Sequence, residues 1–129
     1  MDIGVVIVTH YGLGEQFLQA LKLIVPGAPQ FYAVAVEPEQ SIDEMRYAIS
    51  AAIKDADQGK GVLILTDMFG GSPSNISLSF LKEFKVEVVT GVNLPMLIKL
   101  ASVASSSNLL DAARQIREHG RNSIWVASD

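Results

Sequence analysis

The sequence predicts an α/β fold with a mostly parallel sheet, and three observations lead to this prediction. Five short apolar runs recur along the 129 residues, and stretches with helical periodicity separate them. Hydrophobic residues make up 49% of the chain and charged residues 19%, which fits helices covering a very apolar sheet and excludes a disordered chain. The length suits one domain, so we expect a single unit over residues 1–129.

Each apolar run predicts a strand, and each periodic stretch predicts a helix. The predicted strands span, in order, Ile3–Val8, Phe31–Val36, Gly61–Thr66, Val86–Thr90 and Ser123–Ala127. The predicted helices span Leu13–Val25, Ser41–Ala56, Ser72 to about Leu81, a stretch that begins after Asn93, and Asn108–His119.

Local signals set the ends of several helices. Ser41 and Glu44 have the spacing of a capping box, in which each side chain bonds the backbone N–H of the other residue. Pro73 suits a first helical turn because proline lacks an N–H, so Ser72 is expected as the N-cap. Gly120 is expected just beyond the last helix, before the final strand.

Composition limits the classes of function. The longest apolar runs, such as Val5–Val8 and Val62–Leu65, are far shorter than the roughly 18 to 20 residues that span a bilayer. Asp2 follows Met1 without a basic leader, so no secretory signal is expected, and the lack of cysteine excludes disulfides and thiolate chemistry. A net charge of −4 argues against nucleic acid as a partner. We therefore expect a cytoplasmic protein without a membrane span.

Two polar residues stand where predicted strands end. His10 follows the apolar run Ile3–Val8, and Asp67 follows Gly61–Thr66. The ligand crevice of an open α/β sheet lies at the carboxyl ends of its strands. If the first and third strands are neighbours, roughly 4.8 Å apart, the two side chains can hydrogen-bond. An aspartate that accepts from one imidazole nitrogen leaves the other nitrogen nucleophilic, which predicts chemistry at His10.

The turn after Asp67 adds a place for an anion. Gly70 and Gly71 let the backbone approach a ligand closely, and the helix that starts near Ser72 would aim free N–H groups at an anion. Together with His10, this turn predicts a nucleophile beside a phosphate site. The plainer alternative is that His10 is an ordinary loop histidine and that the glycines only form a tight turn.

Other candidate sites have less support. Lys60 lies in a GKG segment without the upstream glycine or the Ser or Thr of a Walker loop. His119 lies near a helix end, where an imidazole can bond terminal carbonyls, so a structural role is favoured. A hydrolase nucleophile at Ser72 is disfavoured because Pro73 has no N–H to give an oxyanion hole. One His and one Asp fall short of the three protein ligands of a catalytic zinc, so no metal is expected.

Three ordered motifs carry a resemblance to a known family. They are IVTH at the end of the first run, TDMFGGSPSN at residues 66–75 and TGVNLPML at residues 90–97. With these motifs the chain resembles the mannose-type enzyme IIA components of the bacterial phosphoenolpyruvate-dependent sugar phosphotransferase system, nearly end to end. The resemblance implies a flavodoxin-like open sheet of order 2-1-3-4 with helices on both faces. It also implies an antiparallel C-terminal strand that can be exchanged in a homodimer.

The resemblance also implies roles for the site residues. His10 would accept a phosphoryl group from the phosphocarrier HPr and pass it to a IIB component, without a cofactor, while the membrane components IIC and IID take part only indirectly. Asp67 would orient the imidazole, and Ser72 would hydrogen-bond within a phosphate site that includes Gly70 and Gly71. The rim on which HPr and IIB dock would be formed by Tyr11, Met68 and Phe69.

Several alternatives stay open at this stage. The main one is a regulatory binding module whose contacts depend on the phosphorylation of His10, without sugar transport. A flavin-binding protein is less consistent with the sequence, because the first loop lacks a run of Ser and Thr hydroxyls for a flavin phosphate. A receiver domain would need acidic residues where this chain has Thr9 and His10. The sugar cannot be read from the sequence, because the resemblance places sugar specificity in the membrane components.

Overall fold

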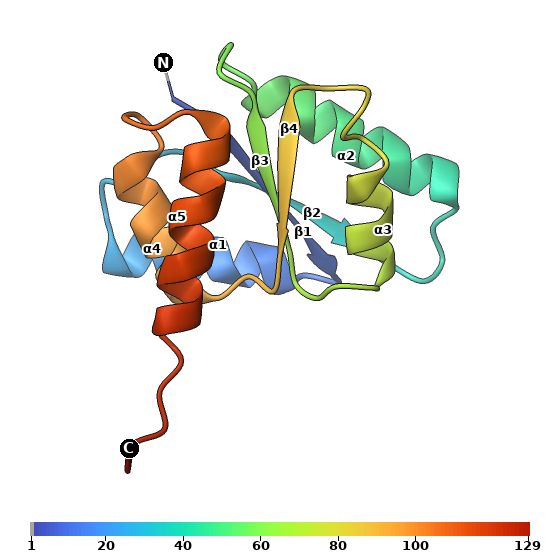
Figure 1. Cartoon of the computed structure of the whole chain (residues 1–129). Helices are drawn as coiled ribbons and strands as arrows, with labels where there is room; N and C mark the ends of the chain where they lie inside the picture. Colours follow the sequence, from blue (N-terminus) through green and yellow to red (C-terminus); the bar gives the residue numbers. More distant parts are fainter. Residues whose placement is uncertain (1) are drawn as a thin grey trace.

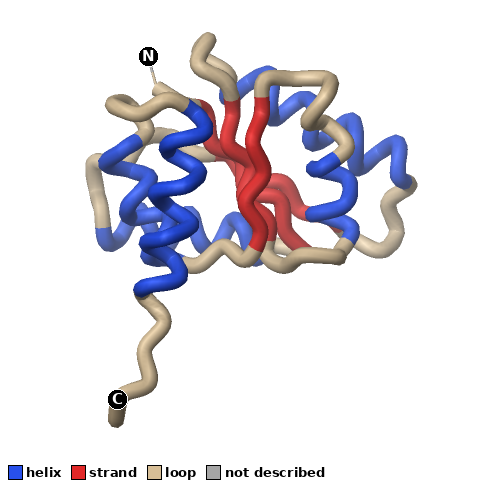
Figure 2. The backbone as a smooth tube through the Cα atoms, in the orientation of Figure 1, coloured by secondary structure: helices blue, strands red, loops and turns tan. Residues whose placement is uncertain are grey.

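The computed structural model of the chain describes residues 2–129, and it shows a parallel sheet between two layers of helices (Figures 1 and 2). The four strands are β1 (Gly4–His10), β2 (Tyr32–Val36), β3 (Val62–Thr66) and β4 (Val86–Thr90). They lie in the order β2-β1-β3-β4, and all three neighbouring pairs are parallel. The α/β class and the order 2-1-3-4 are therefore confirmed.

Within residues 2–129, five helices cover the two faces of the sheet. They are α1 (Leu13–Ile24), α2 (Ile42–Ala56), α3 (Ser72–Leu78), α4 (Leu94–Val103) and α5 (Leu109–Asn122). Helices α1, α4 and α5 pack on one face, and α2 and α3 pack on the other (Figure 1). No helix of residues 2–129 is both long and apolar enough to cross a membrane.

Alternation along β1 and β3 divides the core into two clusters. Ile7 and Leu65 point towards α1, α4 and α5, whereas Val8 and Ile64 point towards α2 and α3. All four side chains are fully buried, because helices cover both sides of these central strands. The two central strands therefore form a rigid support, and the residues that follow them lie at one edge of the sheet.

The predicted capping box at the start of α2 is confirmed. The Ser41 hydroxyl accepts from the Glu44 N–H at 3.1 Å, and the Ser41 N–H donates to the Glu44 carboxylate at 3.0 Å. These two bonds satisfy backbone donors that a helix start otherwise leaves free. The predicted start of α4 is also confirmed, since Asn93 is its N-cap and a proline stands in its first turn.

The prediction that Ser72 is the N-cap of the third helix is wrong. Gly71 occupies the cap with an extended backbone, and Ser72 is the first residue of α3. The helix also ends at Leu78 and not near Leu81. The Ser77 hydroxyl bonds back to the Pro73 carbonyl at 2.6 Å, and serine hydroxyls that bond to helix carbonyls weaken a helix.

The prediction that the last helix stops at Gly120 is also wrong. Helix α5 continues through Gly120 to Asn122. A Cβ atom at position 120 would lie 2.5 Å from Cγ of Met96. The glycine therefore serves close packing of α5 against α4 and not the end of a helix.

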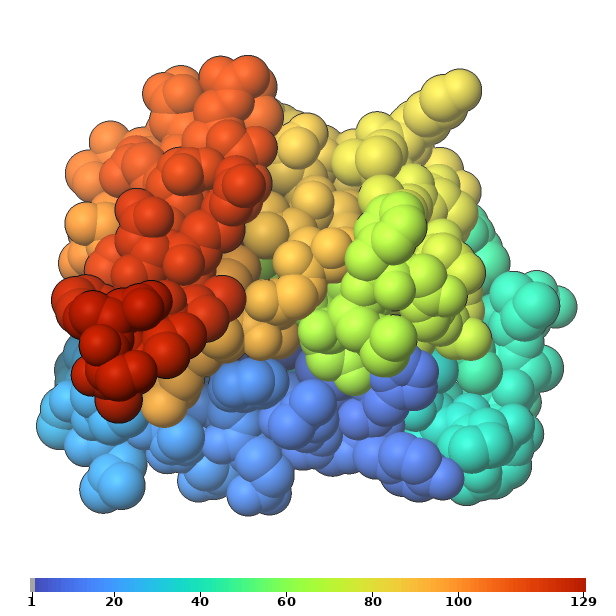
Figure 3. Space-filling view, turned by 60° about the horizontal axis from the view of Figure 1, so that its bottom comes forward, coloured from blue at the N-terminus to red at the C-terminus, as the bar shows by residue number. Residues whose placement is uncertain are grey.

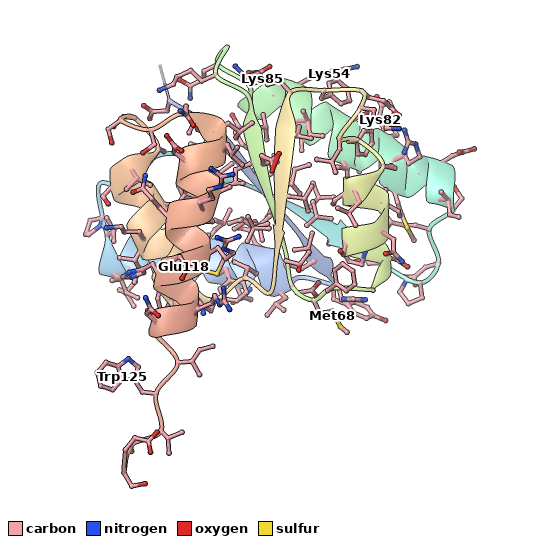
Figure 4. All side chains as sticks on the ribbon, in the orientation of Figure 1. Lys54, Met68, Lys82, Lys85, Glu118 and Trp125 are labelled. Atoms are coloured by element: carbon pink, nitrogen blue, oxygen red, sulfur yellow. The ribbon has the colours of Figure 1, made fainter. Side chains whose placement is uncertain are left out.

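No strand forms after α5 in the described part of the chain. The expected strand Ser123–Ala127 is a turn followed by an irregular segment that projects away from the end of α5 (Figures 1 and 4). Ile124, Trp125 and Val126 are 76%, 84% and 63% exposed. The segment pairs with no strand within residues 2–129, and its apolar side chains lie in solvent.

Candidate functional site

The parallel pairing of β1 and β3 brings His10 and Asp67 together, as predicted. Val8 and Thr66 are register partners, so His10 and Asp67 both lie at the carboxyl edge of the sheet. Nδ1 of His10 lies 2.8 Å from Oδ2 of Asp67. The same oxygen accepts the backbone N–H of His10 at 2.9 Å. The carboxylate thus holds both the main chain and the ring of one residue.

The carboxylate of Asp67 is fixed and ionised. Its other oxygen accepts the Met68 N–H at 3.0 Å, and its side chain is only 11% exposed. Burial alone raises the pKa of Asp67, but the hydrogen bonds and the charge interaction with His10 together outweigh burial, so the pKa lies below the usual 3.8. Because an ionised carboxylate only accepts hydrogen bonds, the shared proton belongs to Nδ1 and a neutral His10 has its lone pair on Nε2.

The glycine turn after β3 lies against the imidazole of His10. A Cβ atom at Gly71 would lie 2.8 Å from Cε1 and 3.2 Å from Nε2 of the ring. Gly70 has a φ of +89°, a conformation that side chains rarely adopt. Both glycines are therefore required by geometry: one by the shape of the turn, the other by its approach to the ring.

Ser72 offers unused hydrogen-bonding groups beside this turn. Its side chain is exposed, and within residues 2–129 its hydroxyl has no hydrogen-bond partner. The backbone N–H groups of Gly71 and Ser72 likewise bond no acceptor in the described chain. The role of Ser72 within the site stays a prediction.

Three large side chains stand around His10 at the surface. Tyr11, Met68 and Phe69, which we call the rim, are 58%, 55% and 73% exposed. Met68 points outward at the carboxyl edge of the sheet (Figure 4), and in Figure 3 the segment that follows β3 stands out from the molecular surface. The site is thus an open surface feature with apolar groups beside it.

Sequence reasoning missed the supporting role of Thr9. Its buried hydroxyl accepts the Gly14 N–H at 2.8 Å and donates to the Tyr11 carbonyl at 3.3 Å. Helix α1 has Gly12 at its N-cap and no side-chain cap there. Thr9, which belongs to the preceding strand β1, therefore accepts a backbone N–H of the first turn that would otherwise be free. The sequence did contain a signal for this role: a polar residue ends an apolar run, and the helix that follows begins without a capping side chain.

Comparison with known proteins identifies the family of this chain. The model of a family described as PTS system fructose IIA component, where PTS denotes the phosphotransferase system, matches residues 4–117. The chain belongs to this family. It is therefore a IIA component of the sugar phosphotransferase system, which confirms the resemblance found in the sequence.

Individual relatives of this IIA component agree with that assignment. A sorbose-specific EIIA component of Lacticaseibacillus casei is 29% identical over 93% of this chain and 89% of the relative. A fructose-specific EIIA component of Bacillus subtilis is 27% identical over 98% and 88%. A mannose-specific EIIAB component of Escherichia coli K12 is 31% identical over 77% of this chain, which spans only 31% of that relative.

Solved structures share the fold of this IIA component. A mannose/sorbose-specific IIA subunit from Enterococcus faecalis has a TM-score of 0.87 over 98% of this chain and 95% of that chain, at 24% identity. A IIA protein associated with the fucose utilization operon of Streptococcus pneumoniae has a TM-score of 0.83 at 27% identity over 99% and 95%.

The remaining candidates lie away from the His10 site. His119 is an exposed residue of α5 and borders a hollow with Val25 and Ile98. Lys60 lines a different hollow, beside Phe84 near the amino end of β4. Within residues 2–129, no group of three His, Cys, Asp or Glu side chains is arranged to hold a metal ion.

The lowered pKa of Asp67 predicts how stability depends on pH. Because the folded-state pKa lies below 3.8, stabilisation by the ionised carboxylate is fully present above that value and is lost as pH falls through the folded-state pKa. Asp67→Asn removes this titration. We expect urea titrations between about pH 6 and about pH 3 to give a shrinking difference in free energy of unfolding between wild type and variant. A difference that stays constant with pH would contradict this expectation.

Proposed function

We propose that this IIA component is a phosphoryl carrier, which accepts a phosphoryl group from phospho-HPr on Nε2 of His10 and passes it to a IIB component during sugar uptake. The observation that carries the proposal is the pairing of His10 with Asp67. Nδ1 is engaged at 2.8 Å by an ionised carboxylate, so the neutral ring presents its lone pair at Nε2. The proposed acceptor atom is therefore the nitrogen beside the glycine turn.

Transfer then proceeds in line at phosphorus. The Nε2 lone pair forms the new bond to phosphorus as the bond between phosphorus and its donor atom in phospho-HPr breaks, and the electron pair of that bond returns to HPr. The Nδ1 proton stays on the ring, where the Asp67 carboxylate balances the positive charge that develops on the imidazole. The reverse sequence, with IIB as acceptor, discharges His10.

The glycine turn supplies donors for the phosphoryl oxygens. Within residues 2–129, the N–H groups of Gly71 and Ser72 and the Ser72 hydroxyl have no hydrogen-bond partner and are available to such oxygens. Hydrogen bonds from such groups stabilise charge on equatorial oxygens. Because the site is open, a docked partner must supply the remaining wall that keeps water out.

This assignment concerns the phosphoryl group and not the sugar. The relatives named above are specific for sorbose, fructose and mannose, yet all resemble this chain at 27% to 31% identity. A site of one histidine, one aspartate and a glycine turn can handle a phosphoryl group whatever sugar finally receives it. We therefore propose that the sugar is selected elsewhere in the system.

The acceptor atom is tested by intact-mass analysis. The chain is incubated with phosphoenolpyruvate, enzyme I and HPr, and wild type is compared with His10→Ala and His119→Ala. We expect one acid-labile phosphoryl adduct on wild type and on His119→Ala, and none on His10→Ala. Adding a IIB component should remove the adduct and phosphorylate IIB. An adduct that forms but never moves to IIB would favour the regulatory alternative, and no adduct with active phospho-HPr would refute the proposal.

The role of the glycine turn is tested by Gly71→Ala. The backbone at Gly71 has φ −83° and ψ 169°, which alanine adopts without strain, so the fold should be retained. The new methyl group would meet Cε1 and Nε2 of His10 and force the ring away from Asp67. We expect phosphorylation from phospho-HPr to slow by at least about tenfold, which corresponds to a rise of about 1.4 kcal/mol in the activation free energy. Gly12→Ala is the matched control, because a Cβ there meets no atom within 4 Å.

We also propose that the segment after α5 pairs with β4 of a second copy. Strand β4 is the last strand of the sheet, so its outer edge has unpaired backbone groups. A hollow at its carboxyl end is lined by Thr90, Arg117 and Ile124, and the apolar segment projects beyond it. Exchange of this segment between two chains would cover both the edge and the apolar side chains.

The exchanged segment is tested with point variants that leave the core intact. Ile124→Asp combined with Val126→Asp should shift the sedimentation of the protein from dimer to monomer. Leu23→Asp, at an 83% exposed position of α1, is the control and should stay dimeric. Equal sedimentation of wild type and the double variant would refute the proposed exchange.

A further inference from the structure

Tyr11 has the backbone conformation normally left to glycine. Its φ is 49°, and it is the single non-glycine residue of the described chain with positive φ. The left-handed region brings Cβ of an L-residue too close to the backbone, so bulky side chains are rarely found there. The residue lies directly after the proposed phosphoryl acceptor.

The side chain of Tyr11 is more than half exposed, at 58%, and makes no hydrogen bond within residues 2–129. Two backbone contacts hold the turn: the Tyr11 N–H donates to the Val36 carbonyl at 3.0 Å, and the Tyr11 carbonyl accepts from Thr9 at 3.3 Å. Glycine could make both contacts without the steric conflict.

A strained residue beside a reactive group points to a use outside the isolated fold. We infer that Tyr11 is a specificity-determining residue whose ring contacts the protein that delivers the phosphoryl group, which under the proposed function is phospho-HPr. The inference rests on that function and identifies one residue of the rim as its main contact. The two other rim residues, Met68 and Phe69, are likewise large and exposed, at 55% and 73%.

The strained turn also explains why the ring suits this contact. Because the backbone is held on both sides of Tyr11, the ring is presented at a fixed place and only its two side-chain torsions must be ordered on docking. A tyrosine ring combines large contact area with low loss of conformational entropy, and such residues are enriched at interaction hot spots. The contribution is to docking, so it should appear in KM and not in kcat.

The test measures initial rates of His10 phosphorylation at varied concentrations of phospho-HPr. Tyr11→Gly should raise KM for phospho-HPr about tenfold while kcat stays within about twofold. Its Tm should be equal to or above that of wild type, because the left-handed strain is relieved. Tyr11→Phe should behave like wild type, since the ring is kept. The control Tyr47→Ala removes a tyrosine that is 77% exposed on α2 and should change neither constant.

The possible outcomes distinguish a docking role of Tyr11 from a structural role and from failure of the proposed function. An unchanged KM in Tyr11→Gly would overturn the inference while leaving the phosphoryl carrier in place. A joint fall of kcat and Tm would overturn it in favour of a structural role. A wild-type chain that accepts no phosphoryl group from active phospho-HPr would refute the proposed function itself.

Discussion

The structure of the site depends on one carboxylate oxygen. Oδ2 of Asp67 accepts both the backbone N–H and the ring Nδ1 of His10, at 2.9 and 2.8 Å. These two bonds need β1 and β3 to be neighbours, parallel and in a register that ends both strands at the same edge. Helices on both faces hold the central strands in that arrangement, so the core of the protein positions a single hydrogen-bonded pair.

The pair also sets the electrostatics of the site. Burial opposes the charge on Asp67, and hydrogen bonds from His10 more than restore it. The carboxylate therefore stays ionised and fixes the tautomer of a ring that is itself 45% exposed. A buried orienting group beneath an accessible ring suits chemistry that occurs between two proteins, because a macromolecular partner can reach the ring but not the carboxylate.

Sequence reasoning placed the four strands and the two central site residues, but it missed features that depend on side-chain hydrogen bonds or on contacts between elements. The positions of His10 and Asp67 followed from the ends of apolar runs. The end of the last helix did not, because Gly120 responds to a side chain on another helix, Met96. The predicted strand Ser123–Ala127 does not form in the described chain, where this segment pairs with no other strand. The positive φ of Tyr11 could not be predicted from the sequence, because tyrosine rarely adopts a left-handed backbone conformation.

The uncovered edge of β4 has a consequence for the newly made chain. A monomer that has just folded carries an unpaired strand edge and, beyond α5, a segment whose large apolar side chains are 63% to 84% exposed. Both features can promote non-specific association with other chains. Strand β4 has only five residues, which reduces this tendency but does not remove it. If a second copy covers this edge, as proposed above, aggregation during synthesis should depend on how quickly the two chains meet.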